Sequence, residues 1–197
     1  MGVAFGWCTG GTFASGPGDG ALAAPYGLTV NRAADRLYIV EQGNSRITRV
    51  AASTGAYLGS IGVLMGSTGT CPSTGGAAGW CTGGTFVGSG ADGGFSDPRA
   101  VVGDNAGNLY VGDQSANRVV RISEADGAFK GAIGYVTSST GTCLPGATSA
   151  SGWCTGGTFG STQADGSFPT VNGLAIDTAS TTLFTLQILP PLIQRLK

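Results

Sequence analysis

Gly6-Trp7-Cys8-Thr9-Gly10-Gly11-Thr12-Phe13 is a stretch that returns unchanged at residues 79–86 and again at residues 152–159. Its tryptophans lie 73 residues apart both times. Three identical octapeptides at one spacing indicate an internal repeat, and such a repeat has to be identified before any local pattern is interpreted. The chain therefore contains nearly three copies of one unit, of which the third is short.

The composition favours a folded β-rich chain over a disordered one. Glycine accounts for 37 of 197 residues, only 11% of residues are charged, and 41% are hydrophobic. Many glycines among short apolar runs are typical of tight turns between short strands. The net charge of −1 argues against a nucleic-acid partner. There is also no apolar run of the roughly 18 residues that a membrane span needs.

Each copy has a strand-rich part in which β-branched and aromatic runs alternate with Gly, Asn and Asp turns. This pattern predicts a four-stranded antiparallel meander. The third copy begins in the same way, but its fourth strand is missing and residues 186–192 depart from the pattern. The expected division is the end of an insert at 1–18, strand-rich parts at 19–62 and 91–134, inserts at 63–90 and 135–163, and an incomplete strand-rich part at 164–197.

The five cysteines follow the repeat. Cys71 precedes Cys81 by ten residues and Cys143 precedes Cys154 by eleven, whereas Cys8 would need a partner before residue 1. We predict one disulfide in each insert, with Cys8 left over in an excerpt from a longer array. A zinc site is the alternative, but the spacing is wrong for paired Cys-x-x-Cys ligands and the chain has no histidine. Disulfides indicate an oxidising compartment, so we expect a secreted or cell-surface protein.

The strand-rich parts resemble the NHL repeat of β-propeller proteins. The resemblance rests on an ordered set of landmarks that appears in two copies, namely Asp92-Gly93-Gly94-Phe95, Pro98, Leu109-Tyr110-Val111-Gly112-Asp113 and Asn117-Arg118-Val119, with Pro25, Gly27-Leu28, Leu37-Tyr38-Ile39-Val40 and Ser45-Arg46-Ile47 in the first copy. It covers about three fifths of the chain. The cysteine-containing inserts depart from the ordinary repeat and look like those of bacterial extracellular arrays. The resemblance implies four-stranded propeller blades packed radially, typically about 4–8 to a ring.

Asp19, Asp92 and Asp165 recur at the same spacing, each before a glycine. They could be metal-binding carboxylates. We favour a turn aspartate that caps its own backbone before the first strand, because calcium loops gather several acidic ligands and these three stand alone.

Arg46 and Arg118 open the third strand of their copies. They could bind a ligand carboxylate. We favour a repeated polar contact between blades, with Glu41 and Asp113 as the partners.

Trp7, Trp80 and Trp153 could form a ladder on which carbohydrate stacks. We favour a hydrophobic plug beside each disulfide loop. The Ser/Thr-rich inserts could carry O-linked glycans, and no N-glycosylation sequon occurs in the chain.

Catalysis has little support in the sequence. The chain has no histidine, and no nucleophile elbow, phosphate loop or pair of catalytic carboxylates stands out. Some propellers of this type are lyases or lactone hydrolases with a central metal, but their ligands have no evident counterparts here. We expect a non-enzymatic structural protein without a cofactor, which associates with other copies or adjacent repeats into a ring or fibre. A propeller that binds protein or glycan is the alternative.

Overall fold

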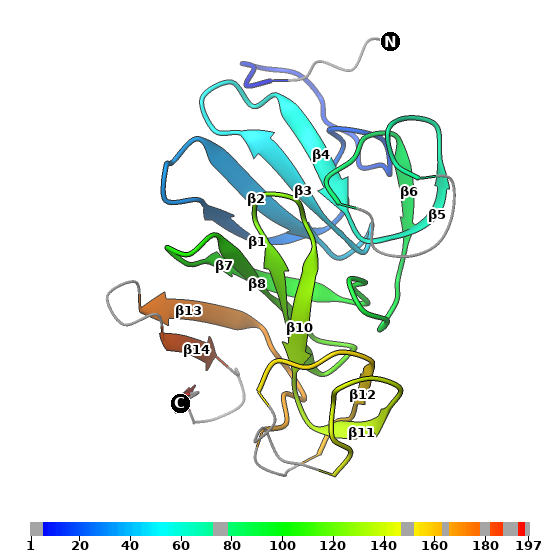
Figure 1. Cartoon of the computed structure of the whole chain (residues 1–197). Coiled ribbons are helices and arrows are strands. Elements are labelled where there is room, and N and C mark those ends of the chain that lie inside the picture. The colour runs from blue at the N-terminus through cyan, green and yellow to red at the C-terminus, as the bar shows by residue number, and fades with distance from the viewer. Residues whose placement is uncertain are drawn as a thin grey trace.

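The computed structural model describes residues 6–72, 79–146, 152–162, 166–177, 182–186 and 193–195. Within these ranges the chain is all-β, in antiparallel sheets, and contains no helix. Figure 1 shows three sheets that follow one another from the top of the view to the bottom, with two small hairpins beside them on the right. The all-β class predicted from the sequence is confirmed.

Two of the sheets are four-stranded meanders with the same order of strands. Sheet 1 runs β1 (Pro25–Val30), β2 (Arg36–Glu41), β3 (Arg46–Ala51) and β4 (Tyr57–Ile61). Sheet 2 runs β7 (Pro98–Gly103), β8 (Asn108–Asp113), β9 (Arg118–Ser123) and β10 (Phe129–Ile133). Each strand matches a predicted β-branched or aromatic run, because those residues suit a pleated surface that is buried on a face.

Sheet 3 has three strands in the part of the chain that the structure describes. They are β13 (Gly173–Asp177), β14 (Thr182–Leu186) and β15 (Ile193–Arg195). Their register pairs Phe184 with Arg195. The divergent segment 186–192 lies outside the described residues, apart from its first position.

The inserts contain strands that the sequence pattern did not predict. In the first insert β5 (Val63–Ser67) pairs with β6 (Gly84–Val87), and in the second β11 (Val136–Ser139) pairs with β12 (Gly157–Phe159). Each hairpin is joined to the neighbouring sheet by a β-bridge, Ser60 to Cys81 in one case and Ala132 to Cys154 in the other. The repeated octapeptide thus contributes both the bridge and a hairpin strand.

The core lies between the sheets. Tyr38, Val40 and Ile47 of sheet 1 form one buried cluster with Leu109 and Val111 of sheet 2. On its other side sheet 2 packs against sheet 3, where a second cluster is formed by Tyr110, Val119, Phe168 and Val171 with the partly buried Leu174 and Ile176. Sheet 2 is therefore buried on both faces. This explains why strand β8 lacks the usual alternation of buried and exposed residues.

The first strands of sheets 1 and 2 approach each other closely. A side-chain carbon on Gly27 would lie 2.7 Å from the carbonyl oxygen of Arg99 and 2.9 Å from the Cα of Ala100. Glycine at position 27 therefore permits backbone contact between β1 and β7 that a larger residue would prevent.

Truncation at the buried interface should cost far more stability than truncation at the uncovered face of sheet 1. Leu109 is fully buried and Leu28 is 66% exposed. Leu109→Ala should lower the free energy of unfolding by about 2–5 kcal/mol, because it removes buried methyl groups and leaves a cavity. Leu28→Ala should change it by no more than about 0.5 kcal/mol. Urea denaturation of both variants measures the difference, and equal losses would contradict the assignment of the core.

Candidate functional site at the sheet junctions

Trp80 connects sheet 1 to sheet 2. Its indole ring lies on sheet 1, with its centre 5.5 Å from that of Tyr38 and 4.5 Å from the guanidinium carbon of Arg49. Its ring N–H donates to the carbonyl of Glu124 at 2.9 Å, and its backbone N–H donates to the carbonyl of Asp126 at 3.3 Å. Both carbonyls belong to the turn that joins β9 to β10. One side chain therefore contacts two neighbouring sheets.

The other two tryptophans each reproduce part of this arrangement. The ring centre of Trp153 lies 5.4 Å from that of Tyr110 and 4.8 Å from the guanidinium carbon of Arg121, and both of these residues are in sheet 2. Trp7 makes the two hydrogen bonds, from its ring N–H to the carbonyl of Ala52 and from its backbone N–H to that of Thr54, both at 2.9 Å. Trp7 is 64% exposed. The hydrophobic plug beside each disulfide stays a prediction, and Trp80 in addition connects two sheets.

Arg46 and Glu41 form a fully buried ion pair within sheet 1. The Nε of Arg46 donates to a Glu41 carboxylate oxygen at 2.7 Å, and both side chains are fully buried. The other guanidinium nitrogens donate to the carbonyls of Pro17, Gly18 and Ala21 at 2.7–3.1 Å. These carbonyls belong to the segment that leads into β1, which we call the entry segment of sheet 1. A buried charge is tolerated only when it is paired and hydrogen-bonded, and here the two groups satisfy each other.

Arg118 occupies the same position in sheet 2, with a looser carboxylate contact. It donates to the carbonyls of Ala91 and Gly94 at 2.9 Å, but its Nε lies 3.6 Å from Asp113. Aspartate is one methylene shorter than glutamate, and Asp113 also accepts the backbone N–H groups of Ser96 and Asp97. Burial raises the pKa of Asp113 and lowers that of Arg118.

The predicted carboxylate partners of the two arginines are confirmed, and the predicted role is corrected. Within the described ranges, each arginine binds the entry segment of its own sheet and makes no polar contact with a neighbouring sheet. Each also lies near the phenylalanine of the octapeptide, with Arg46 5.8 Å from the ring centre of Phe86 and Arg118 5.9 Å from that of Phe159. Each guanidinium group thus binds the segment that leads into the first strand of its sheet. The phenylalanine of the hairpin that follows that sheet lies near the same guanidinium group.

Asp19 and Asp92 connect each sheet to the insert that follows it. Both carboxylate oxygens of Asp19 accept the backbone N–H of Gly83 at 3.0 Å, and those of Asp92 accept the N–H of Gly156 at 3.0 and 3.2 Å. The predicted local cap is corrected, because each bond spans 64 residues. The donating glycine has a positive φ of 70° in both turns, a conformation that glycine adopts at little cost. Asp165 lies outside the described residues.

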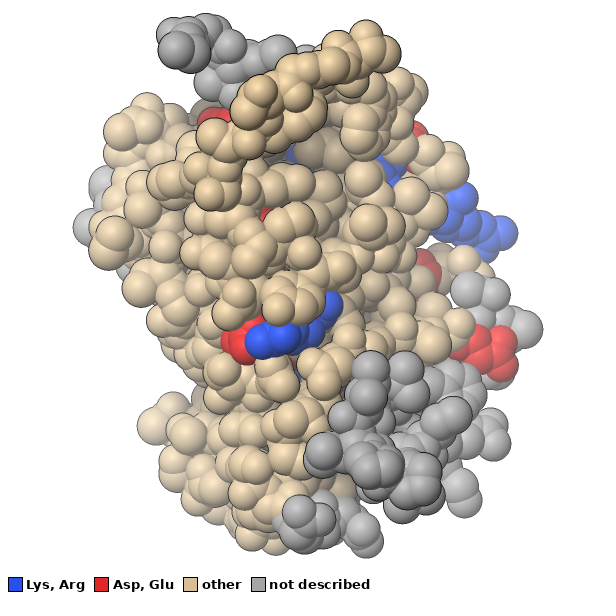
Figure 2. Space-filling view, turned by 180° about the vertical axis from the view of Figure 1, so that it is seen from behind, with Lys and Arg blue, Asp and Glu red and all other residues tan. Residues whose placement is uncertain are grey.

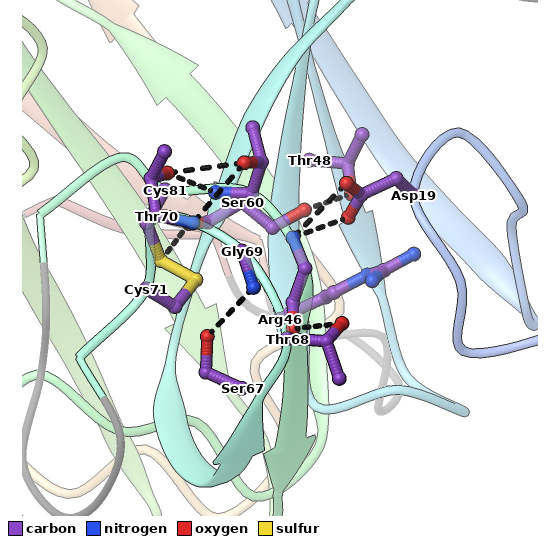
Figure 3. Close-up of a disulfide and its surroundings, with 12 residues drawn as sticks. Asp19, Arg46, Thr48, Ser60, Ser67, Thr68, Gly69, Thr70, Cys71 and Cys81 are labelled. Atoms are coloured by element: carbon purple, nitrogen blue, oxygen red, sulfur yellow. Dashed lines mark hydrogen bonds between the residues drawn. A yellow bond between two sulfur atoms is a disulfide. The ribbon is translucent and has the colours of Figure 1, made fainter.

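The two predicted disulfides are confirmed. Cys71 is bonded to Cys81, and Cys143 is bonded to Cys154, whereas Cys8 is a free, exposed thiol. Figure 3 shows the first disulfide beside Ser60, with Asp19 and Arg46 nearby. The Cys81 backbone is tied to Ser60 by two hydrogen bonds of 2.8 and 3.1 Å. The disulfide therefore closes the insert at the point where the insert joins sheet 1. Such bonds persist in an oxidising setting.

Glu124 is a junction residue that the sequence analysis missed. Its carboxylate, in the turn after β9, accepts hydrogen bonds from the phenol of Tyr38 on β2 at 3.1 Å and from the amide of Asn31, directly after β1, at 3.0 Å. Burial, together with this carboxylate, raises the pKa of Tyr38 to about 12. No repeated motif marks position 124, so its role depends on how the two sheets meet.

The described residues contain no group of three or more His, Cys, Asp or Glu side chains placed to hold a metal ion. Within the same ranges, no helix is long and apolar enough to cross a membrane. Figure 2 shows a face that is largely uncharged, with one adjoining acidic and basic pair near its middle. The repeated contacts are thus concentrated where the sheets and inserts meet.

No known family model matches the chain, and no curated protein matches it either.

Alkylation of the unreduced, folded protein should modify Cys8 alone. Cys8 is exposed and free, whereas the other four cysteines are paired. Peptide mapping without reduction should recover linked peptides for 71–81 and 143–154. The same digest after reduction is the control and should show five modified cysteines. Labelling of Cys71 or Cys143 before reduction would contradict the pairing.

Stability should fall as the pH rises from about 10 to about 12. Burial is the main cause that raises the pKa of Tyr38, Tyr57 and Tyr110 to about 12, from a usual value of 10. Below pH 10 the phenols are neutral in both the folded and the unfolded chain, so their full contribution to the free energy of unfolding is present. Above it the unfolded chain loses protons that the folded chain retains, which favours unfolding.

Urea denaturation across this range measures the effect, in a Cys8→Ser background that prevents thiolate exchange. Tyr38→Phe removes one of the three phenols, so its free energy of unfolding should depend less steeply on pH. An unchanged slope in that variant would contradict the assignment to Tyr38.

Proposed function

We propose that this protein is a non-enzymatic extracellular structural protein, built of tandem NHL-like β-propeller blades that pack face to face and associate with other copies. The observation that carries the proposal is the repetition of the junction contacts. Trp80 and Trp153 lie on equivalent tyrosine–arginine pairs, and Asp19 and Asp92 bind equivalent glycines of the inserts. A catalytic site needs one unique constellation of groups, whereas repeated contacts serve stacking.

Several features support the blade assignment. Sheets 1 and 2 have the same four-strand order, and each packs its apolar face against the next. In propellers, four-stranded sheets are arranged in this manner around an axis. The described residues do not close into a ring, so the proposal includes further blades, contributed by other copies or by adjacent repeats, in a closed ring or an open fibre.

An extracellular location is supported by the two disulfides. The first insert buries only a small apolar cluster of its own, formed by Leu64 and the Cys71–Cys81 pair with the partly buried Phe86. A covalent closure compensates for so small a core. Exposed threonines on the hairpins, Thr85 and Thr158 among them, are candidate positions for O-linked glycans. Glycosylation of these inserts belongs to the proposal.

A binding module for protein or glycan is the second candidate. Trp7 and Phe13 favour it, because they are 64% and 80% exposed and an aromatic face suits stacking on a sugar. An enzyme with a central metal is the least supported candidate, since the sequence has no counterparts of the expected ligands.

Electron microscopy of the purified, unreduced protein tests the proposed function. Filaments or rings with a regular repeat along them are the expected result, because successive sheets stack in one direction. The same sample treated with a thiol reductant is the control, and it should lose order at the inserts. Monodisperse single particles at every concentration would overturn self-association. A change of tryptophan fluorescence on adding glycans to such particles would then favour the binding module.

A further inference from the structure

One face of sheet 1 is apolar and exposed on its β1 side, whereas Glu41, Arg46 and Thr48 on the same face are buried. Leu28 and Val30 on β1 are 66% and 53% exposed. The strand register sets Leu28 opposite Ile39 and Val30 opposite Leu37, so these four side chains share a face. Tyr38 and Val40 point to the other face, which is buried against sheet 2. Contiguous exposed apolar side chains on a sheet are typical of an interaction surface.

The corresponding residues of the other sheets are buried against a neighbouring sheet. In sheet 2 the register sets Val101 opposite Val111, and both lie in the cluster shared with sheet 1. In sheet 3 Leu174 and Ile176 hold the positions of Leu28 and Val30, and they pack in the cluster shared with sheet 2. The same face is thus used twice within the molecule to receive the preceding sheet.

Trp7 marks the same uncovered junction. It makes the two hydrogen bonds to the β3–β4 turn of sheet 1 that Trp80 makes to the corresponding turn of sheet 2. Trp80 is covered on its other side by Tyr38 and Arg49, which are paired in register. Trp7 remains 64% exposed. The missing component is therefore a sheet that carries an aromatic residue paired with an arginine.

The far end of the same chain has that pair. Phe184 and Arg195 are register partners on β14 and β15, as Tyr38 and Arg49 are on β2 and β3, and as Tyr110 and Arg121 are on β8 and β9. Sheet 3 of one molecule therefore places the required residue types at the required register positions for sheet 1 of another. Tryptophan, tyrosine and arginine are also the residues that most often dominate the energy of an interface.

We propose that the exposed β1 side of sheet 1 binds sheet 3 of a second copy of this chain, with Trp7 of the first copy opposite register positions 184 and 195 of the second. The contact is heterologous, since it joins two different surfaces, and such a contact can extend from copy to copy. The inference rests on the proposed function and specifies the surface through which copies associate.

Sedimentation velocity of the full chain over a concentration series tests the proposal. The wild-type protein should form dimers and larger species. Leu28→Asp and Trp7→Ala should weaken association by at least about tenfold, because they alter the centre of the contact. Met65→Asp is the matched control, since Met65 is as exposed as Leu28 but lies on the β5–β6 hairpin. It should associate like the wild type. Circular dichroism verifies that each variant is folded.

A mixing experiment distinguishes the heterologous contact from a symmetric one. Arg195→Glu should weaken association from the other surface. When Leu28→Asp and Arg195→Glu proteins are mixed, each contributes one intact surface, so the mixture should form a dimer that does not grow further. A symmetric contact between two copies of sheet 1 predicts no effect of Arg195→Glu and no dimer of this mixed kind, and that result would overturn the proposal.

The remaining outcomes distinguish a wrong binding surface from a lack of self-association. If the wild type associates and the Leu28 and Trp7 variants associate equally well, the surface is wrong while self-association stands. If the wild type is monomeric at every concentration, self-association itself fails, and the uncovered face takes another occupant.

Discussion

A sheet that is apolar on both faces is stable only between two neighbours, and most of this structure follows from that constraint. Sheet 2 meets it, because Leu109 and Val111 face sheet 1 while Tyr110 and Val119 face sheet 3. Hydrophobic burial is the dominant favourable term in folding and has no direction of its own. Direction comes from the polar contacts at the junctions, which allow each sheet to pack on the next in only one register.

Each kind of polar contact joins a different pair of segments, and it joins the same pair in sheets 1 and 2. The buried arginine fixes the entry segment of its sheet, the aspartate fixes the following insert, and the tryptophan joins one sheet to the next. Each of these groups is charged or carries a strong donor, so leaving one unpaired in the interior would cost more than the bond itself contributes. The junctions are therefore specific as well as stable.

The strands and the disulfides could be predicted from the sequence because their signals are local. Short β-branched runs between Gly and Asn turns gave the meanders, and the ten- and eleven-residue spacings gave the cysteine pairs. The bond between Asp19 and Gly83 could not be predicted, because a turn aspartate has the same sequence signature whether it caps its own turn or a distant amide. Glu124 was missed for a similar reason, since its partners Tyr38 and Asn31 approach it only after sheets 1 and 2 have packed. The strands of the inserts were hidden by their Gly, Ser and Thr content.

Because the three tryptophans lie at different places in the stack of sheets, their fluorescence can report where unfolding begins. Each indole reports on a different place, with Trp80 between sheets 1 and 2, Trp153 on sheet 2 and Trp7 at an uncovered face. In stacked units that touch only their neighbours, disorder enters at an end and advances one interface at a time. Emission from Trp7, which is already 64% exposed, would therefore change little as the stack frays, whereas emission from the partly buried Trp80 would shift when the junction between sheets 1 and 2 opens.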